Sequence, residues 1–159
     1  MTAIDYDSLR FLVIDDSAHM RTVVRAFLRG FGAREIYEAE DGATGLEACI
    51  HFMPDIVLTD WVMPNLDGLE MTRVIRQSGI NADPDVPIIM LSSHTEQGRI
   101  DKAYDAGVTQ LLTKPISARA LYEAVFSVAA NPKAFHGDRE PALARPARER
   151  LGNSRAGVA

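Results

Sequence analysis

Five short segments with strand patterns, each followed by a segment that is expected to be a helix, limit the possible folds of this chain more than any other feature. The run Ile56, Val57 and Leu58 is too short for an independent helix and contains β-branched residues, which is typical of a fully buried strand of a parallel sheet. Because strands and helices alternate, the sequence predicts a doubly wound α/β fold with right-handed crossovers. The expected strands cover residues 10–14, 35–39, 56–59, 87–91 and 110–113.

The helices are predicted from apolar residues at helical spacing and from turn residues at their ends. The first helix carries Met20, Val24 and Leu28, and we expect Gly30 and Gly32 to stop it. The second opens at Asp41 and Gly42. The other expected helices lie around residues 69–75 and over residues 96–106 and 117–130.

Length and composition indicate one soluble domain followed by a tail. The chain has 159 residues, and no apolar run approaches the roughly eighteen residues needed to cross a bilayer, so we expect no membrane insertion. The first residues include acids and lack a secretory pattern. A single cysteine, Cys49, excludes an intrachain disulfide and fits a reducing compartment. We therefore expect a cytoplasmic protein.

Polar residues stand where four of the expected strands end. Asp15 and Asp16 follow the first strand, Asp60 the third, Ser92 the fourth and Lys114 the fifth. In an open α/β sheet, the carboxyl ends of the strands line the ligand crevice. Taken singly, each residue has a simpler explanation, such as a helix cap at Asp15 or Asp16. Their coincidence at one edge favours a functional site.

The residue types at this edge are suited to phosphoryl transfer. Three carboxylates repel one another unless a hard cation neutralises them, and oxygen ligands favour Mg²⁺. A carboxylate such as Asp60 can accept a phosphoryl group as an aspartyl phosphate. Lys114 would supply positive charge to the phosphoryl oxygens, and Ser92 a hydroxyl donor.

These residues, together with the segment from Met63 and Pro64 to Asp67 and Gly68, resemble the receiver domain of two-component response regulators. The resemblance covers about residues 8–130 and implies a CheY-like sheet with strand order 2-1-3-4-5. It implies a phosphoprotein that is not a dedicated enzyme, although it accepts a phosphoryl group from a histidine kinase or a phosphotransfer protein and dephosphorylates itself. The implied roles are phosphoacceptor for Asp60, magnesium ligation for Asp15, Asp16, Asp60 and the Val62 carbonyl, and phosphate sensing for Ser92 and Lys114.

Two departures from the receiver pattern affect the expected signalling. Leu111 occupies the position in the fifth strand where receivers often carry an aromatic switch residue. Val62 and His94 occupy positions where polar or acidic side chains often influence loss of the phosphoryl group. We therefore expect a different route from phosphate to output and a different phosphoryl lifetime from those of fast chemotaxis regulators.

Residues 131–159 differ in charge from the preceding part of the chain. Residues 1–130 contain 11 Lys and Arg against 19 Asp and Glu, whereas residues 131–159 contain 6 against 3. The segment has little apolar surface, and we expect a disordered basic tail without an output domain or a DNA-binding motif. Arginine forks match the acceptors of guanine, and acids can accept from its donors. The candidate residues are Asp138, Arg139, Arg145, Arg148, Arg150, Arg155 and, as a second acid, Glu149.

This tail is similar to the arginine-rich extension of CheY-like single-domain regulators that bind cyclic di-GMP. That resemblance implies that the tail senses cyclic di-GMP and directs the protein to a target such as the flagellar motor switch. One alternative is a phosphorelay intermediate with an inert tail. Another is a haloacid-dehalogenase-like phosphatase, but that class needs a second acid where this chain has Val62.

Overall fold

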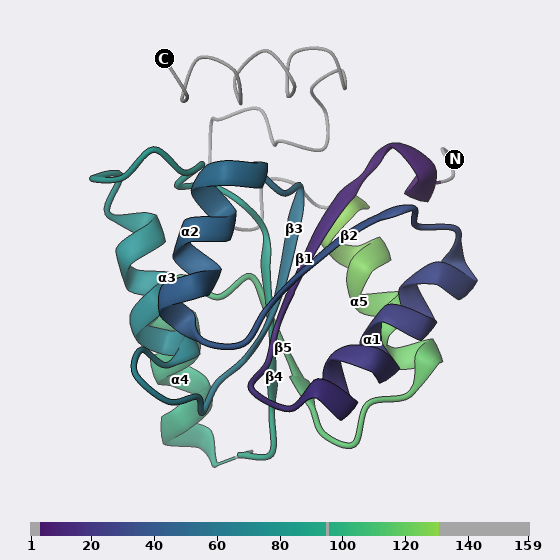
Figure 1. The fold of residues 1–159 in the computed structure, drawn as a ribbon. Helices are drawn as coiled ribbons and strands as arrows, with labels where there is room; N and C mark the ends of the chain where they lie inside the picture. Colours follow the sequence, from purple (N-terminus) through teal and green to yellow (C-terminus); the bar gives the residue numbers. More distant parts are fainter. Residues whose placement is uncertain (1–3, 95, 131–159) are drawn as a thin grey trace.

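The computed structural model describes residues 4–94 and 96–130, which form a five-stranded parallel sheet between two layers of helices (Figure 1). The sheet order is β2-β1-β3-β4-β5, which confirms the predicted fold and order. Register pairs such as Leu12 with Val57 align the carboxyl ends of neighbouring strands. The strands are β1 (Arg10–Ile14), β2 (Glu35–Ala39), β3 (Ile56–Asp60), β4 (Ile88–Ser92) and β5 (Gln110–Thr113).

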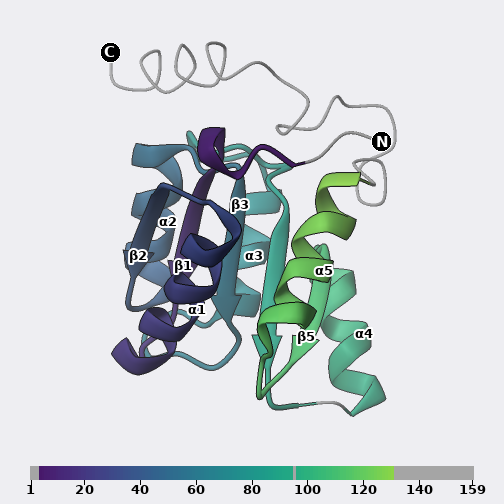
Figure 2. The same ribbon diagram turned by 90° about the vertical axis from the view of Figure 1, so that its right-hand side faces the viewer.

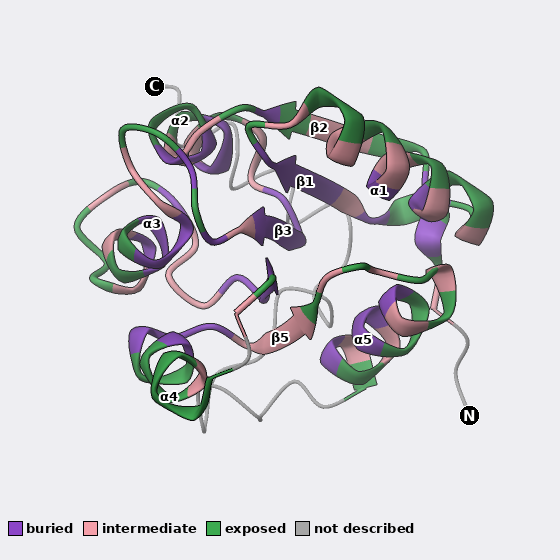
Figure 3. Cartoon of the chain, turned by 90° about the horizontal axis from the view of Figure 1, so that it is seen from below, coloured by how far each residue is buried: buried purple, intermediate pink, exposed green. Residues whose placement is uncertain are grey.

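Helices cover both faces of the sheet, as Figures 2 and 3 show. Helices α1 and α5 lie on one face, and α2, α3 and α4 lie on the other. A short 3-10 turn, η1 (Tyr6–Ser8), precedes β1 and was not predicted. The helices are α1 (Ala18–Phe31), α2 (Gly42–Phe52), α3 (Gly68–Arg76), α4 (Gln97–Ala106) and α5 (Ala118–Ala130).

The core divides along the two faces of the central strands. Phe11 and Val13 of β1 point toward α1 and α5, whereas Leu12 and Ile14 pack with residues of α2 and α3. This alternation follows from the two-residue period of a strand, and the central strands are buried on both faces. A smaller cluster containing Trp61 and Met90 holds α4 against the sheet.

The ends of α1 differ in part from the prediction. Ser17, rather than Asp15 or Asp16, caps the first turn, because its hydroxyl accepts a hydrogen bond from the Met20 amide. The helix continues through Gly30 to Phe31, so the predicted stop at Gly30 is wrong. Gly32 ends it, with φ 111°. An exposed glycine inside a helix costs only about 1 kcal/mol, which packing of the buried helix face outweighs.

Among the helices within residues 4–94 and 96–130, none combines the length and the apolar character that a bilayer crossing requires.

Candidate functional site

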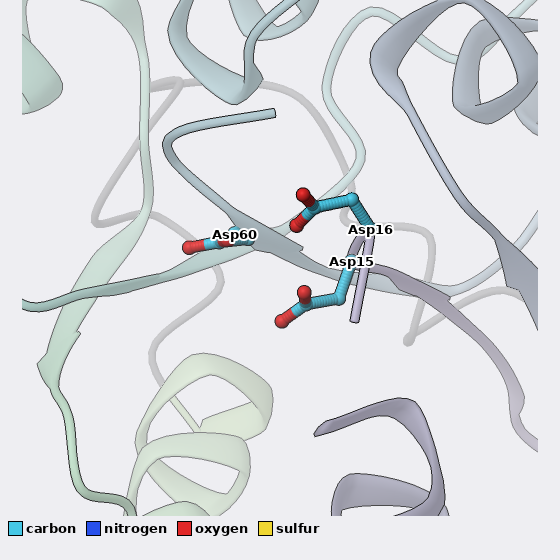
Figure 4. Close-up of side chains that lie close together, drawn as sticks. All are labelled: Asp15, Asp16 and Asp60. Carbon is cyan, nitrogen blue, oxygen red and sulfur yellow. The ribbon is translucent and has the colours of Figure 1, made fainter. Parts of the chain in front are cut away.

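Three carboxylates meet at the carboxyl edge of the sheet. Asp15 and Asp16 follow the end of β1, and Asp60 is the last residue of β3. Each offers one oxygen, and these three oxygens lie within 4.8 Å of one another. Figure 4 shows that the three side chains extend into the same space from two neighbouring strands. The parallel pairing of β1 with β3 therefore brings together acids that are far apart in the sequence.

Asp15 is the most buried member of this acidic cluster. Its Oδ1 accepts a hydrogen bond of 2.9 Å from the Ser17 amide, while its Oδ2 is buried without a hydrogen-bond partner. Burial raises the pKa of Asp15, the Ser17 hydrogen bond opposes that rise, and the nearby charge of Asp60 adds to it. A buried carboxylate oxygen that accepts no hydrogen bond, beside two further acids, fits the oxygen ligands of a hard divalent cation such as Mg²⁺.

Lys114, the residue that follows β5, supplies positive charge to this cluster. Its Nζ lies 3.1 Å from Oδ1 of Asp60 and 3.6 Å from Oδ2 of Asp15. Its backbone amide donates to the Ser92 carbonyl at 2.8 Å, and the peptide bond that joins it to Pro115 is cis. The ammonium group therefore contacts two of the three acids, as the edge location of the residue predicted.

Two glycines set the path of the loop after Asp60. The Gly68 amide donates to the Trp61 carbonyl at 2.8 Å, and the Gly42 amide donates to the Leu66 carbonyl at 3.0 Å. A Cβ atom on Gly68 would lie 2.1 Å from the Asp60 carbonyl oxygen, and one on Gly42 would lie 2.2 Å from that of Leu66. Both positions therefore exclude any side chain, which explains why a glycine stands at each of them.

The same loop contributes two further features to the site. The Trp61 amide donates to Oδ1 of Asp60 at 2.9 Å, and the Trp61 ring is buried. The Arg99 guanidinium of α4 lies over this ring, 5.6 Å from its centroid. Val62 is 59% exposed beside the phosphoacceptor candidate, where a polar side chain was the expectation for the family. The role of its carbonyl stays a prediction.

Ser92 lies at the same edge, but its hydroxyl bonds within its own loop. The side chain is 2% exposed, and its Oγ accepts a hydrogen bond of 2.9 Å from the His94 amide. The His94 Nδ1 lies 3.8 Å from a carboxylate oxygen of Glu96. Ser92 is thus brought to the functional edge without a direct bond to the three acids.

Leu111, the expected switch position, lies half-buried in β5 against the cluster that contains Trp61 and Met90. Its amide donates to the hydroxyl of Tyr104 at 3.2 Å. Tyr104 belongs to α4 and is 46% exposed. An aromatic side chain therefore does stand next to this position, although it comes from the neighbouring helix and was missed by sequence reasoning.

Sequence reasoning also missed a basic residue behind the acidic cluster. Arg21 of α1 donates from Nη1 to the Asp15 carbonyl and from Nε to Glu38. Its helical position after Ser17 was a weak signal, because a lone arginine on an amphipathic helix is most often a solvated surface residue. The tail residues predicted to bind cyclic di-GMP, namely Asp138, Arg139, Arg145, Arg148, Glu149, Arg150 and Arg155, lie outside the described residues.

Comparison with known proteins places the chain among signalling proteins. The sequence profile of the family described as "Response regulator receiver domain" matches residues 11–126, which include Asp15, Asp60 and Lys114. Chemotaxis protein CheY-3 of Vibrio cholerae serotype O1 is 33% identical over 126 residues, which are 77% of this chain and 93% of that protein. A protein-glutamate methylesterase/protein-glutamine glutaminase of Koribacter versatilis is 39% identical over 116 residues, 71% of this chain but 31% of that protein.

Solved structures agree with these sequence matches. Chemotaxis protein CheY4 of Vibrio cholerae has a TM-score of 0.69 and 26% sequence identity, covering 76% of this chain and 98% of that one. The receiver domain of the Francisella response regulator 1452 has the same TM-score and 25% identity, covering 76% of this chain and 95% of that one. The likeness therefore extends over nearly the whole length of the two solved structures.

Proposed function

Because this chain belongs to the response regulator receiver domain family, we propose that it is a single-domain response regulator that is phosphorylated on Asp60 in a two-component system. The observation that carries the proposal is the arrangement of Lys114, whose ammonium lies 3.1 Å from Asp60 and 3.6 Å from Asp15 at one edge of the sheet. The phosphoryl donor is a histidine kinase or a phosphotransfer protein. The protein acts by binding a target rather than as a dedicated enzyme.

The proposed chemistry assigns a role to each side chain at the edge. The Trp61 amide and Lys114 both bind Oδ1 of Asp60, which leaves Oδ2 to attack the phosphorus as the bond to the donor breaks. Lys114 and the Ser92 hydroxyl then hold the phosphoryl oxygens. Asp15, Asp16 and Asp60 would hold Mg²⁺ together with the Val62 carbonyl, and the bound ion would neutralise charge on the transferring group.

Phosphorylation from a small-molecule donor tests this role. The full chain is incubated with acetyl phosphate and Mg²⁺, and intact mass spectrometry follows the addition of one phosphoryl group. Asp60→Asn should abolish the addition, whereas Asp105→Asn, an exposed acid on α4, should leave it unchanged. Equal phosphorylation of the Asp60→Asn variant would exclude Asp60 as the acceptor.

We further propose that residues 131–159 form a separate segment from the receiver domain at residues 8–130 and bind cyclic di-GMP. Support comes from residue types alone: five arginines from Arg139 to Arg155 stand among three acids, and arginine forks complement guanine. Such a segment would direct the regulator to a protein target, and the match to a chemotaxis protein makes the flagellar switch the first target to test.

Calorimetric titration separates this proposal from a phosphorelay role. Cyclic di-GMP is titrated into the full chain and into a version that ends at Phe135, which keeps every described residue. Binding at micromolar concentration that disappears on truncation is the expected result. Absence of heat with both proteins would overturn the proposal and favour a phosphorelay intermediate, which should return its phosphoryl group to a phosphotransfer domain.

A further inference from the structure

We propose that Arg21 is a positioning residue for the acidic cluster, because it holds the peptide group between Asp15 and Asp16. The inference rests on the proposed function, in which this cluster holds Mg²⁺ beside Asp60. Arg21 is not among the residues proposed to hold Mg²⁺ or the phosphoryl group, and it acts through the backbone that carries two of the proposed Mg²⁺ ligands.

The contact falls on the peptide that joins the two ligands. Arg21 Nη1 donates to the Asp15 carbonyl oxygen at 2.5 Å. That carbonyl lies beyond Ile14, the last residue of β1 in register with β3. A charged donor at this point restricts the rotation of the peptide plane, which sets the direction in which the Asp16 side chain leaves the backbone.

The neighbouring contacts fix Asp15 more firmly than Asp16. The Asp15 amide donates to the Ala39 carbonyl at 3.1 Å, and its Oδ1 accepts from the Ser17 amide. Asp16 is exposed and stands between these two anchored points. The Arg21 hydrogen bond therefore adds a third anchor to this segment, at the carbonyl of the peptide that links Asp15 to Asp16.

Arg21 is itself oriented by a carboxylate on β2. Its Nε donates to one oxygen of Glu38 at 3.2 Å, while Arg25, one helical turn later, donates to the other oxygen at 2.6 Å. The planar guanidinium serves two acceptors at once, which a lysine ammonium on a flexible stem does less well. Arg21 also lines an open cleft of about 290 Å³, together with Glu38, Ala39, Glu40 and Thr44. Water from this cleft can replace a lost donor, so removal of Arg21 should weaken the site without abolishing it.

Charge alone predicts the opposite effect from positioning. Arg21 brings a positive charge to the backbone beside the acidic cluster, so a purely electrostatic role would make Mg²⁺ bind more tightly after its removal. Positioning predicts weaker binding. Arg25 is a matched control, because it shares Glu38 with Arg21 but has no described contact with Asp15.

The experiment compares Arg21→Gln, Arg21→Lys and Arg25→Gln with the unchanged full chain. Mg²⁺ is titrated while the fluorescence of Trp61, the single tryptophan, is followed, because its amide bonds to Asp60. We expect Arg21→Gln to raise the Kd for Mg²⁺ about tenfold, the scale of one charge-assisted hydrogen bond. Arg21→Lys should raise it by a smaller factor, and Arg25→Gln should leave it within about twofold.

A second measurement needs no metal. Hydrogen exchange of the Ser17 amide, which bonds to Asp15, should be faster in metal-free Arg21→Gln than in metal-free Arg25→Gln. Both variants lose one ion pair with Glu38, and Arg21→Gln also loses the hydrogen bond to the Asp15 carbonyl, so its thermal midpoint should be no higher than that of Arg25→Gln.

The two possible failures are distinguishable. If the unchanged protein does not bind Mg²⁺, the proposed metal site fails, and Ser17 exchange still decides whether Arg21 anchors this segment. If Arg21→Gln binds Mg²⁺ as tightly as Arg25→Gln or more tightly, with equal Ser17 exchange, the positioning role is overturned.

Discussion

The Lys114 ammonium lies 3.1 Å from Oδ1 of Asp60, although the two residues are 54 positions apart in the chain. The sheet order explains this distance, because β3, β4 and β5 are consecutive neighbours and all end at the same edge. The Lys114 amide also donates to the Ser92 carbonyl at 2.8 Å, so the backbone of Lys114 is tied to the end of β4. The ion pair therefore depends on the register of three strands.

Replacement of Lys114 by glutamine should have opposite effects on metal binding and on phosphorylation. Without the ammonium, the three acids repel one another more strongly, and Mg²⁺ should bind at least as tightly as before. Phosphorylation of Asp60 by acetyl phosphate should slow at least about tenfold, because charge on the phosphoryl oxygens loses its partner. The metal-free protein should lose about 1–2 kcal/mol of unfolding free energy. Fluorescence titration, mass spectrometry and urea denaturation measure the three effects, and unchanged phosphorylation would contradict the role of Lys114.

Asp15→Asn should stabilise the metal-free protein at neutral pH while weakening Mg²⁺ binding. Burial raises the pKa of Asp15, so its ionised form costs stability, and the variant should gain on the order of 1 kcal/mol at pH 7. Because the folded-state pKa lies above the ordinary value of 3.8, this cost is absent below that pH and develops as the pH rises through the folded-state pKa. Thermal unfolding of both proteins across this range measures the difference. If the difference in stability between the two proteins widened toward acid pH, the predicted direction of the pKa shift of Asp15 would be wrong.

Gly68→Ala and Gly30→Ala should have opposite effects on stability. A Cβ at Gly68 would lie 2.1 Å from the Asp60 carbonyl oxygen, so the loop must move, at a cost of about 3 kcal/mol, and Mg²⁺ binding should weaken with it. A Cβ at Gly30 has no neighbour within 4 Å, and alanine should stabilise α1 by about 0.5–1 kcal/mol. Urea denaturation measures both variants. A Gly68→Ala protein as stable as the original would refute the close backbone approach.

Tyr6→Phe should be neutral or stabilising, and its advantage should grow in alkali. The Tyr6 hydroxyl is buried without a hydrogen-bond partner, so its removal should change stability by no more than about 1 kcal/mol at pH 7. Burial, with a smaller contribution from Tyr122, raises the pKa of Tyr6 from 10.0 to about 12. Because the Tyr6 hydroxyl ionises more readily in the unfolded chain, the unchanged protein keeps its full stability below pH 10 and loses stability as the pH rises toward 12. Denaturation of both proteins at pH 7 and at alkaline pH tests this, and a larger loss in the phenylalanine variant would contradict it.

Tyr104→Phe should loosen the outer edge of β5 at the switch position. The variant loses the hydrogen bond of 3.2 Å from the Leu111 amide, at a cost of about 0.5–1 kcal/mol, and the Leu111 amide should exchange faster. Tyr122→Phe is the control, because Tyr122 is similarly exposed and its described contacts are between rings. Equal exchange of the Leu111 amide in both variants would mean that the Tyr104 hydroxyl does not protect it.

The fold was predictable because β1, β3 and β4 are short buried runs and because strand and helix patterns alternate along the chain. Some strand boundaries differ by one residue from the prediction: β3 includes Asp60, and β4 starts at Ile88 and includes Ser92. The error at Gly30 has a physical cause, since a propensity of about 1 kcal/mol does not decide where a packed helix ends. Gly32 ends the helix because its backbone is left-handed, with φ 111°.

The acidic cluster was also predictable, because a polar residue at the carboxyl end of a parallel strand lies at the functional edge of the sheet. Asp15, Asp16 and Asp60 do lie together there, with Lys114 in contact. The supporting residues were not predictable, because Arg21 and Tyr104 act on backbone groups and their own sequence positions carry no sign of this. A hydrogen bond to a backbone carbonyl or amide does not depend on the side chain of the partner residue, so the residue type of the partner gives no sign of it.

By itself, the sequence determined the strand and helix pattern, the parallel sheet and the acids at its edge, because periodicity and strand-end residues are local properties. Tertiary structure decided which contacts hold those acids in place. Lys114 reaches Asp60 only through the register of β3, β4 and β5, and Arg21 reaches the Asp15 carbonyl only because α1 packs beside the end of β1. Such contacts depend on distances of a few ångströms between residues of different structural elements, which packing sets and local residue patterns do not encode.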